Sequence, residues 1–357
     1  MTGLFLLLAV GAAGWIFGLR RRLILMAVAV AWAVIELAHL LSPGLGAFFG
    51  GTAQGWLVAG GAAALMLVYR GVLTGLRARA APDQPAMSSD AGLTDDEIDR
   101  YARHLVLREV GGPGQMRLHD ARVLVVGAGG LGSPVCLYLA AAGVGRITVA
   151  DDDHVSLSNL QRQVIFRSDQ RGERKAVAAA DAMAALNPRI AVTGVLRRIT
   201  EHDTDLIAGH DLVLDGTDSF AVRQAINRAC VAAGVPLIAG SIAQWEGQVA
   251  LYDPARGGPC LACLFPVPPA PGLALPCAEA GVIGPLPGVV GSLMALEAIK
   301  HLTGVSKSGA GQGLRGRLLI FDGLHGESRM IATQRRADCP VCGSAHVPEP
   351  QETHRER

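Results

Sequence analysis

The apolar residues of the chain are concentrated at its start, in three long runs separated by polar residues. The runs cover residues 3–19, 23–41 and about 45–69, and each is about as long as a helix that crosses a bilayer. Arginines follow the first and third runs, and such residues favour the cytoplasmic side of a membrane. The pattern therefore predicts that residues 1–79 are a multi-pass transmembrane anchor of three helices in the inner (cytoplasmic) membrane, with the remaining chain facing the cytoplasm.

A signal peptide followed by a buried hairpin is the alternative for this region. It is disfavoured because arginines follow the first apolar run and no A-x-A-like cleavage site ends it. Residues 80–92 are small, polar and Pro-containing, which is typical of a flexible linker. Thr94 and Glu97 then form a capping-box pattern that predicts the start of a helix. We expect a folded domain over residues 93–345 and a tail over 346–357.

After the linker, the apolar pattern is that of alternating buried strands and helices. Strands are predicted at Arg122–Val126 and Ile147–Ala150, with an apolar helix at 134–142 between them. The glycine-rich segment 127–132, GAGGLG, joins the first strand to the helix, and Asp151 ends the second strand. This order is the fingerprint of a dinucleotide-binding fold, in which glycines admit a phosphate and the acid binds ribose hydroxyls. Many dehydrogenases share it, so the fingerprint does not by itself distinguish hydride transfer from chemistry at a phosphate.

The polar residues that follow favour chemistry at a phosphate. Arg162 and Lys175 lie in polar segments shortly after the ribose acid, where hydride transfer needs no cation, whereas attack on ATP builds negative charge on phosphate oxygens. A further strand, Leu212–Asp215, leads to Asp218 at the strand edge where open α/β sheets bind ligands. A carboxylate there can hold the Mg²⁺ that bridges ATP phosphates. Taken singly, each of these cations has the alternative of being a solvated surface group.

Composition and cysteine spacing add two constraints. The chain has 32 Lys and Arg against 31 Asp and Glu, so it lacks the basic footprint of a nucleic-acid-binding protein. Four of its 7 cysteines form two C-x-x-C pairs, Cys260 with Cys263 and Cys339 with Cys342. Four thiolates can close a tetrahedral structural zinc site, and two redox pairs are the alternative.

The motifs together resemble the MoeB/ThiF/HesA family, the bacterial relatives of ubiquitin-activating enzymes. The segments RYARHLVL, GAGGLG, VSLSNLQRQ, GERKA and DGTDS and both C-x-x-C pairs occur here in that family's order, from about Leu93 to Gly343. The resemblance implies a Rossmann-like α/β fold with a mixed sheet and a structural zinc site. It also implies that ATP and magnesium are held by Gly130, Asp151, Ser158, Asn159, Leu160, Gln161, Arg162, Lys175, Asp218 and Ser219. The other candidate nucleotide-binding residues are Gly127, Gly129 and Gly132 of the glycine-rich turn, and Asp153. Ser219 departs from the asparagine that is usual there, so we expect weakened contacts at that position.

Two further residues are carried over from the family. The position of Arg103 supplies an arginine to the partner protomer's site, which implies a homodimer. The position of Cys277 lies on a loop that crosses the carrier protein's tail, and in some members it takes up the activated carboxyl. Cys277 is therefore a candidate nucleophile, with a merely positional cysteine as the alternative. The catalytic candidates are Asp218, Arg162, Lys175, Arg103 and Cys277.

The resemblance predicts an adenylyltransferase that activates the C-terminal glycine carboxylate of a ubiquitin-like sulfur-carrier protein. The preferred substrate is the small subunit of molybdopterin synthase, and the sulfur comes from a separate donor protein. The thiamine-pathway carrier or a peptide is second. An NAD-dependent oxidoreductase and a non-catalytic, membrane-tethered nucleotide-binding scaffold are more distant alternatives.

Overall fold

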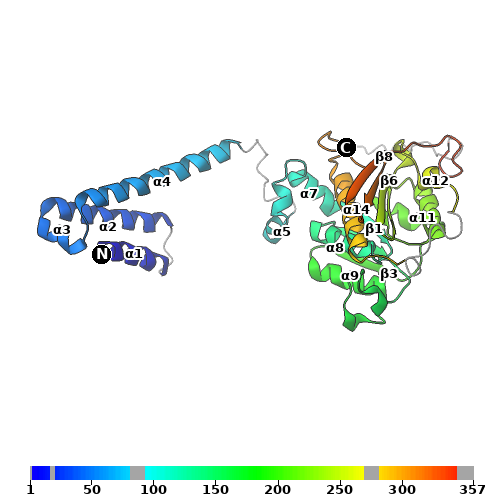
Figure 1. Cartoon of the computed structure of the whole chain (residues 1–357), viewed down its shortest axis with the longest axis horizontal. Helices are drawn as coiled ribbons and strands as arrows, with labels where there is room; N and C mark the ends of the chain where they lie inside the picture. The colour runs from blue at the N-terminus through cyan, green and yellow to red at the C-terminus, as the bar shows by residue number, and fades with distance from the viewer. Residues whose placement is uncertain (1, 17–20, 81–92, 269–280, 344–357) are drawn as a thin grey trace. The chain divides into compact units, whose positions relative to one another are not determined.

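The structure is a computed structural model that describes residues 2–16, 21–80, 93–268 and 281–343. The chain divides into two units, Met1–Ser88 and Ser89–Arg357. The family motifs all fall in the second unit, and each unit is described by itself (Figure 1).

The first unit consists of helices joined by short breaks. Its helices are α1 (Thr2–Ile16), α2 (Arg21–Leu41), α3 (Pro43–Phe49) and α4 (Ala53–Ala80). Proline at its first position suits the start of α3, because the ring presets a helical φ. The break between α3 and α4 falls at Gly50 and Gly51, whose φ angles of 76° and 83° are outside the right-handed helical region.

The predicted transmembrane anchor is wrong for the described residues. No helix among them is both long enough and apolar enough to cross a membrane. α1 has 15 residues, fewer than the 17 to 25 or so that a span requires. The third apolar run is divided between α3 and α4, and α2 carries Glu36 and His39 within its length. The expected multi-pass location in the inner membrane, with the catalytic domain facing the cytoplasm, depended on these spans and is therefore also wrong.

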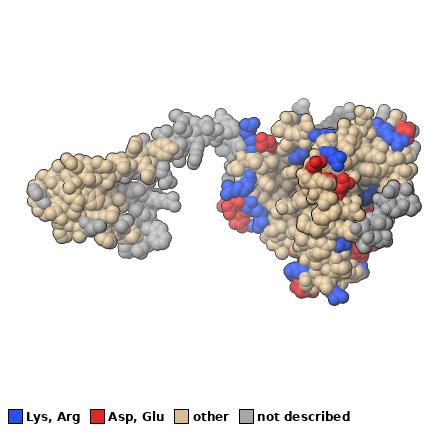
Figure 2. Space-filling view, viewed as in Figure 1, with Lys and Arg blue, Asp and Glu red and all other residues tan. Residues whose placement is uncertain are grey.

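The surface of the first unit is nevertheless apolar. The face shown in Figure 2 is tan wherever it is described, without lysine, arginine, aspartate or glutamate. Large exposed side chains include Phe5 (68%), Leu41 (73%) and Val58 (72%). The apolar pattern of the sequence is thus only partly used in packing among these helices.

The second unit is built on one mixed sheet of eight strands in the order β3-β2-β1-β4-β5-β6-β7-β8. Strands β1 to β5 pair in parallel, whereas β5 to β8 pair antiparallel. The strands are β1 (Arg122–Val126), β2 (Arg146–Ala150), β3 (Ala191–Val195), β4 (Leu212–Asp215), β5 (Leu237–Ala243), β6 (Glu246–Tyr252), β7 (Arg317–Asp322) and β8 (Glu327–Ala332). The predicted Rossmann-like fold with a mixed sheet is confirmed.

Helices cover both faces of the sheet, and each face has its own apolar core. One core includes Val125, Leu139, Met183 and Val290, from β1, α8, α9 and α14, and the other includes Val213 and Ile226, from β4 and α11. The longer helices are α7 (Gly111–Asp120), α8 (Gly132–Ala142), α9 (Lys175–Leu186), α11 (Phe220–Ala233) and α14 (Pro285–Thr303). The shorter ones are α5 (Asp95–Arg100), α6 (Ala102–Leu105), α10 (Thr204–Ala208), α12 (Leu261–Leu264), η1 (Leu157–Asn159), η2 (Ser168–Gln170) and η3 (Pro254–Arg256).

The local predictions agree with this fold. All three predicted strands are present as β1, β2 and β4, because runs of β-branched and apolar residues can be buried on both faces of a parallel sheet. The predicted capping box is also present: the backbone N–H of Glu97 donates to Thr94 Oγ1, and the Glu97 carboxylate accepts from the Thr94 N–H at 2.9 Å. α5 therefore begins where the sequence predicts.

Candidate functional site

A cavity of about 730 Å³ opens at the carboxyl ends of the parallel strands. Its walls come from the turn after β1, the segment after β2, the turn after β4, and the antiparallel half of the sheet. Nine of the residues predicted to hold nucleotide line it: Gly127, Gly129, Gly130, Asp151, Asp153, Arg162, Lys175, Asp218 and Ser219. The volume lies within the ordinary range of small-molecule sites.

The glycine-rich turn is tight, and two of its glycines are required by geometry. Gly127 has a φ of 87°, which residues with a side chain rarely adopt. A Cβ on Gly132 would lie 1.8 Å from the carbonyl oxygen of Gly127, so only glycine allows α8 to begin this close to β1. Gly132 thus allows the tight turn without lining the cavity, whereas Gly127, Gly129 and Gly130 line it.

Asp151 fixes the turn to the end of β2. Its carboxylate accepts hydrogen bonds from the backbone N–H groups of Ala128 and Asp153, both at 2.8 Å. Burial raises the pKa of this carboxyl above its ordinary 3.8, although the two N–H donors and Lys175 oppose the shift. Each carboxylate oxygen has a further lone pair, so Asp151 can still accept a hydroxyl from a ligand.

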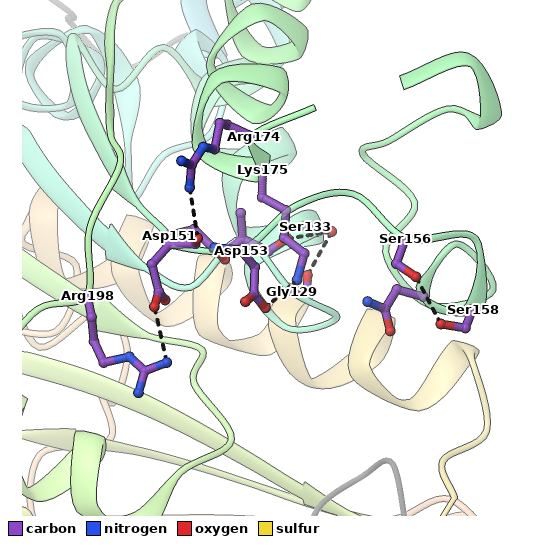
Figure 3. Close-up of polar contacts among 12 residues, drawn as sticks. Gly129, Ser133, Asp151, Asp153, Ser156, Ser158, Arg174, Lys175 and Arg198 are labelled. Carbon is purple, nitrogen blue, oxygen red and sulfur yellow. Dashed lines mark hydrogen bonds and ion pairs between the residues drawn. The ribbon is translucent and has the colours of Figure 1, made fainter. Parts of the chain in front are cut away.

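Lys175 is the first residue of α9, and its side chain is only 5% exposed. Its Nζ lies 2.9 Å from Asp153 Oδ2, and Figure 3 shows both side chains beside the turn at Gly129. A buried ammonium requires a partner, and Asp153 provides it. This pair places a cation at the cavity wall close to the glycine-rich turn.

Arg162 is positioned by the segment that precedes it. Its guanidinium donates to the Asn159 side-chain oxygen at 2.7 Å and to the Ser158 carbonyl at 3.3 Å. Gln161 lies against the start of α14, where a Cβ on Gly284 would be 2.3 Å from its carbonyl oxygen. Leu160 packs on the core. Ser158 to Gln161 therefore lie outside the cavity lining and hold Arg162 within it.

Asp218 and Ser219 lie in the turn between β4 and α11. Asp218 is exposed and lines the cavity. The preceding Asp215 is fully buried, and its Oδ1 accepts the Thr217 N–H at 2.8 Å, which holds the turn in place. Burial raises the pKa of Asp215, and the nearby Arg223 opposes that shift.

Three cations of the cavity were missed by sequence reasoning: Arg197, Arg198 and Arg223. The first two follow β3, a strand whose residues Ala191–Val195 are partly exposed and include a glycine, so its apolar signal is weak. Arg198 pairs with Asp152 at 3.1 Å and Arg197 with Asp203 at 2.5 Å. Recognising β3 would have placed both arginines at the ligand-binding edge.

Two of the predicted catalytic residues are not among the described residues that line the cavity. Arg103 lies on α6, is exposed, and makes no ion pair with a described carboxylate. Cys277 lies outside the described residues.

The two C-x-x-C pairs come together in one cluster. All four cysteines are at most 6% exposed, and their sulfurs lie within 4.8 Å of one another. Sulfur separations of 3.9 Å (Cys260–Cys263), 3.6 Å (Cys260–Cys339) and 3.4 Å (Cys263–Cys342) are close to the roughly 3.8 Å edge of a tetrahedron with Zn–S bonds of about 2.3 Å. The ligand set and spacing thus fit zinc.

The cavity as a whole is suited to a phosphate-bearing ligand. Among the described residues, its cations Arg162 and Arg223 have no carboxylate partner, unlike Lys175, Arg197 and Arg198. Phosphate oxygens could accept hydrogen bonds from these two arginines, since the planar guanidinium group matches the geometry of a phosphate. A glycine-rich turn, unpaired cations and an acid at the edge of β4 define a nucleotide-binding α/β enzyme.

Comparison with known proteins places this enzyme in a family. The ThiF family model matches residues 101–341, more than half of the chain. The chain is 48% identical over 255 residues to the sulfur carrier protein adenylyltransferase of Thermus thermophilus, covering 70% of this chain and 92% of that protein. The chain belongs to the ThiF family, and it is an adenylyltransferase that uses ATP.

Two other relatives set the limits of the comparison. The mouse protein named adenylyltransferase and sulfurtransferase MOCS3 is 46% identical over 261 residues, which is 72% of this chain but 55% of that protein. The crystal structure of E. coli MccB with MccA-N7isoASN has a TM-score of 0.61 at 24% identity and covers 68% of this chain and 75% of that chain. The structural likeness concerns the fold alone.

The raised pKa of Asp151 leads to a pH-dependent prediction. If its ionised carboxylate accepts ribose hydroxyls, affinity for adenosine falls on acidification at a pH above the ordinary Asp value of 3.8, as the carboxyl takes up its proton. Calorimetry with adenosine between about pH 4 and pH 7 avoids titration of phosphates. Asp151→Asn is expected to bind roughly tenfold more weakly at pH 7 and to show a flat profile. A wild-type profile that is equally flat would contradict the role.

Proposed function

We propose that this adenylyltransferase acts on the small subunit of molybdopterin synthase. The chain activates the C-terminal carboxylate of a ubiquitin-like sulfur-carrier protein by adenylation. The observation that supports this best is the joint presence of a cation-lined cavity at the glycine-rich turn and 48% identity to a protein named as a sulfur carrier protein adenylyltransferase. We also propose that a separate protein supplies the sulfur.

The cavity residues suggest how ATP is held. Gly127, Gly129 and Gly130 would admit the phosphates to the backbone, and Asp151 would accept the ribose hydroxyls. Arg162 and Lys175 would neutralise charge on the phosphates as it builds in the transition state. Asn159 and Asp153, which contact those two cations, would keep them aimed into the cavity.

Asp218 is the proposed ligand of Mg²⁺. It offers a carboxylate to the cavity from the edge of β4, and carboxylate oxygens are the ligands that Mg²⁺ prefers. Bound there, the ion would neutralise phosphate oxygens. Ser219, the next residue, would add a hydroxyl contact that is weaker than the family's usual asparagine.

The reaction that this arrangement supports is a displacement at the α-phosphorus. An oxygen of the carrier's C-terminal carboxylate forms a bond to the α-phosphorus, and the bond to the bridging oxygen of pyrophosphate breaks. The products are acyl-adenylate and pyrophosphate. The carboxylate is already ionised at neutral pH, so no general base is needed. Arg162 and Lys175 hold the charged oxygens in place during this exchange.

The far wall of the cavity could receive the carrier's tail. It is formed by Gln248 and Tyr252 of β6 and by Phe265 and Val267, two partly or fully exposed apolar residues after α12. An extended glycine-rich tail lacks bulky side chains and can lie along such a wall. Cys277 follows in sequence, and we retain it as a candidate acceptor of the activated carboxyl.

The cysteine cluster is proposed to hold a structural zinc ion. Four thiolates fill a tetrahedral shell and leave no position for water, so the metal would take no part in adenylation. The Arg336 backbone N–H approaches Cys263 Sγ at 3.5 Å, and Asn227 accepts from the Leu261 N–H at 2.9 Å, which orients the first pair.

ATP–pyrophosphate exchange by the full chain tests the proposed substrate. Each candidate carrier is added in turn, together with a version that lacks its last two glycines. Exchange that requires the intact molybdopterin-synthase subunit supports the proposal. Exchange with only the thiamine-pathway carrier or a peptide would contradict it and identify that molecule as the substrate. Bound nicotinamide and no exchange would favour an oxidoreductase. ATP binding without exchange would favour a scaffold.

The proposed homodimer leads to a mixing prediction. If Arg103 completes the partner's site, Arg103→Ala and Asp218→Ala are each inactive, but subunits exchanged between them recover about a quarter of wild-type activity, because a mixed dimer keeps one intact site. The assay is carrier-dependent exchange after the two variants are mixed and incubated. Arg108→Ala, also exposed, is the control and should be active alone. No recovery despite proven subunit exchange would place Arg103 outside the site.

A further inference from the structure

A second cavity, of about 400 Å³, lies at the other end of α14 from the nucleotide cavity. At the first end, a Cβ on Gly130 would be 3.1 Å from Pro287, near the start of the helix. At the second end, His301 of α14 lines the second cavity together with the segment 306–317. At 1.5 Å per residue, these two points of the helix are about 21 Å apart. The second cavity is therefore a separate place in the fold.

The charge of this cavity is positive. Lys307, Arg315 and Arg317 line it, and no carboxylate is among its described lining residues. The nearby Asp253 is fully buried and is shared by Arg315 at 2.6 Å and Arg256 at 3.2 Å, so one negative charge faces two positive ones. Lys307 and Arg317 make no ion pair with any described residue. An anion would be attracted to this excess of charge.

Two donors at this cavity also have no acceptor among the described residues. Ser306 Oγ and Arg315 Nε are buried and have no hydrogen-bond partner among the described residues. A buried donor that stays unsatisfied destabilises the fold, so an acceptor in the cavity would stabilise it.

The loop that closes the cavity brings its backbone close to these groups. It contains Gly309, Gly311 and Gly313 in alternation. A Cβ on Gly313 would lie 2.8 Å from Ser306 Oγ and 2.9 Å from Glu297 Oε1, so glycine permits this close approach. Glu297 is itself engaged by Lys300 at 2.6 Å and by the Leu314 N–H at 2.6 Å.

We propose that this second cavity binds a phosphate group, held by Lys307, Arg317, Arg315 Nε and Ser306 Oγ. A phosphate offers several acceptor oxygens at once, whereas a carboxylate offers two, and all four donors belong to residues that line the cavity. Among the described lining residues, the imidazole of His301 is the only aromatic ring, and the other polar side chains are mostly cations. Gln312, which accepts from Arg317 at 2.7 Å, keeps that guanidinium at the cavity.

His301 provides a reporter that does not depend on catalysis. Burial lowers the pKa of His301 to about 4; Asp253 opposes this shift, whereas Arg315, Lys307 and Arg256 add to it. A bound anion adds negative charge beside the ring, so it favours the imidazolium form and raises that pKa.

The test follows the histidine ring of the full chain by NMR, titrated in orthophosphate and, separately, in pyrophosphate. The resonance is identified by its loss in His301→Asn. Phosphate is expected to raise the pKa of His301 by about one unit relative to chloride at equal ionic strength. A larger rise with pyrophosphate would identify an oligophosphate as the better ligand, and an equal rise would identify a single phosphate group.

Variants separate this cavity from the nucleotide cavity. Lys307→Gln with Arg317→Gln is expected to weaken phosphate binding roughly tenfold per cation while carrier-dependent exchange continues. Arg162→Ala should leave the His301 response intact. The proposal is overturned if the pKa of His301 is the same in phosphate and chloride, or if the response is lost in Arg162→Ala but kept in the double variant. Either result would mean that these cations only offset the negative end of α14.

Discussion

ATP–pyrophosphate exchange by Asp218→Ala is expected to fall by about a thousandfold, since the substitution removes the proposed Mg²⁺ ligand at the point where phosphate charge builds. The fold should be kept, because Asp218 is exposed and the turn that carries it is held by Asp215 and Thr217 instead. The measurement is carrier-dependent exchange at saturating ATP, with thermal unfolding as the check on folding.

The control for this prediction is another exposed aspartate. Asp181 lies on α9, away from the cavity lining, and Asp181→Ala should keep full exchange. Asp218→Asn should recover little activity, because an amide oxygen binds Mg²⁺ without a charge. If Asp218→Ala retains exchange within a few fold of the wild type, another cavity acid, such as Asp152, must serve the metal.

Loss of the proposed zinc ion from the cysteine cluster is expected to lower the melting temperature by roughly 10 °C. The cluster joins residues 79 positions apart, and closing a loop of that length stabilises a fold by about 4 to 5 kcal/mol in the chain-entropy account of cross-links. For a domain of this size, 1 kcal/mol corresponds to about 2 to 4 °C. The measurement compares melting before and after treatment with a strong zinc chelator.

A matched cysteine variant tests the same point without a chelator. Cys339→Ser should lose the zinc measured by elemental analysis and melt early. Cys230→Ala, also at a buried cysteine but in the core beside β4, should keep one zinc per chain and lose about 1 kcal/mol. Equal zinc content in both variants would show that the cluster is not the metal site.

The sequence was a good guide where local pattern and chemistry coincide. The strand Arg122–Val126 and the turn at Gly127 are contiguous, the acid Asp151 ends the next strand, and the steric demands of such a turn leave few alternatives. The cysteine pairs could be predicted equally well, because the short spacing within each C-x-x-C motif places its two ligands side by side in almost any fold. Arg197 and Arg198 were missed because they follow the weakly apolar strand β3.

The transmembrane prediction failed for a different reason. Hydropathy measures how apolar a stretch of sequence is, but it does not indicate where a helix ends within that stretch. α1 ends at Ile16, and positive φ angles at Gly50 and Gly51 divide the third run. The second cavity could not be predicted from the sequence for a related reason. Its cations come from a loop and a strand end, and only the fold brings them together beside His301.

The long separation between the two cysteine pairs has a consequence for how the chain is made. Synthesis on the ribosome runs from the N-terminus, so strands β1 to β5, which form the parallel half of the sheet, have all emerged before Cys260. Cys342 emerges 79 residues after its neighbour Cys263. A nascent chain can therefore assemble its glycine-rich turn and its first core long before the proposed zinc site is complete. Binding of zinc would then be a late step in folding, which stabilises a domain that is already largely formed.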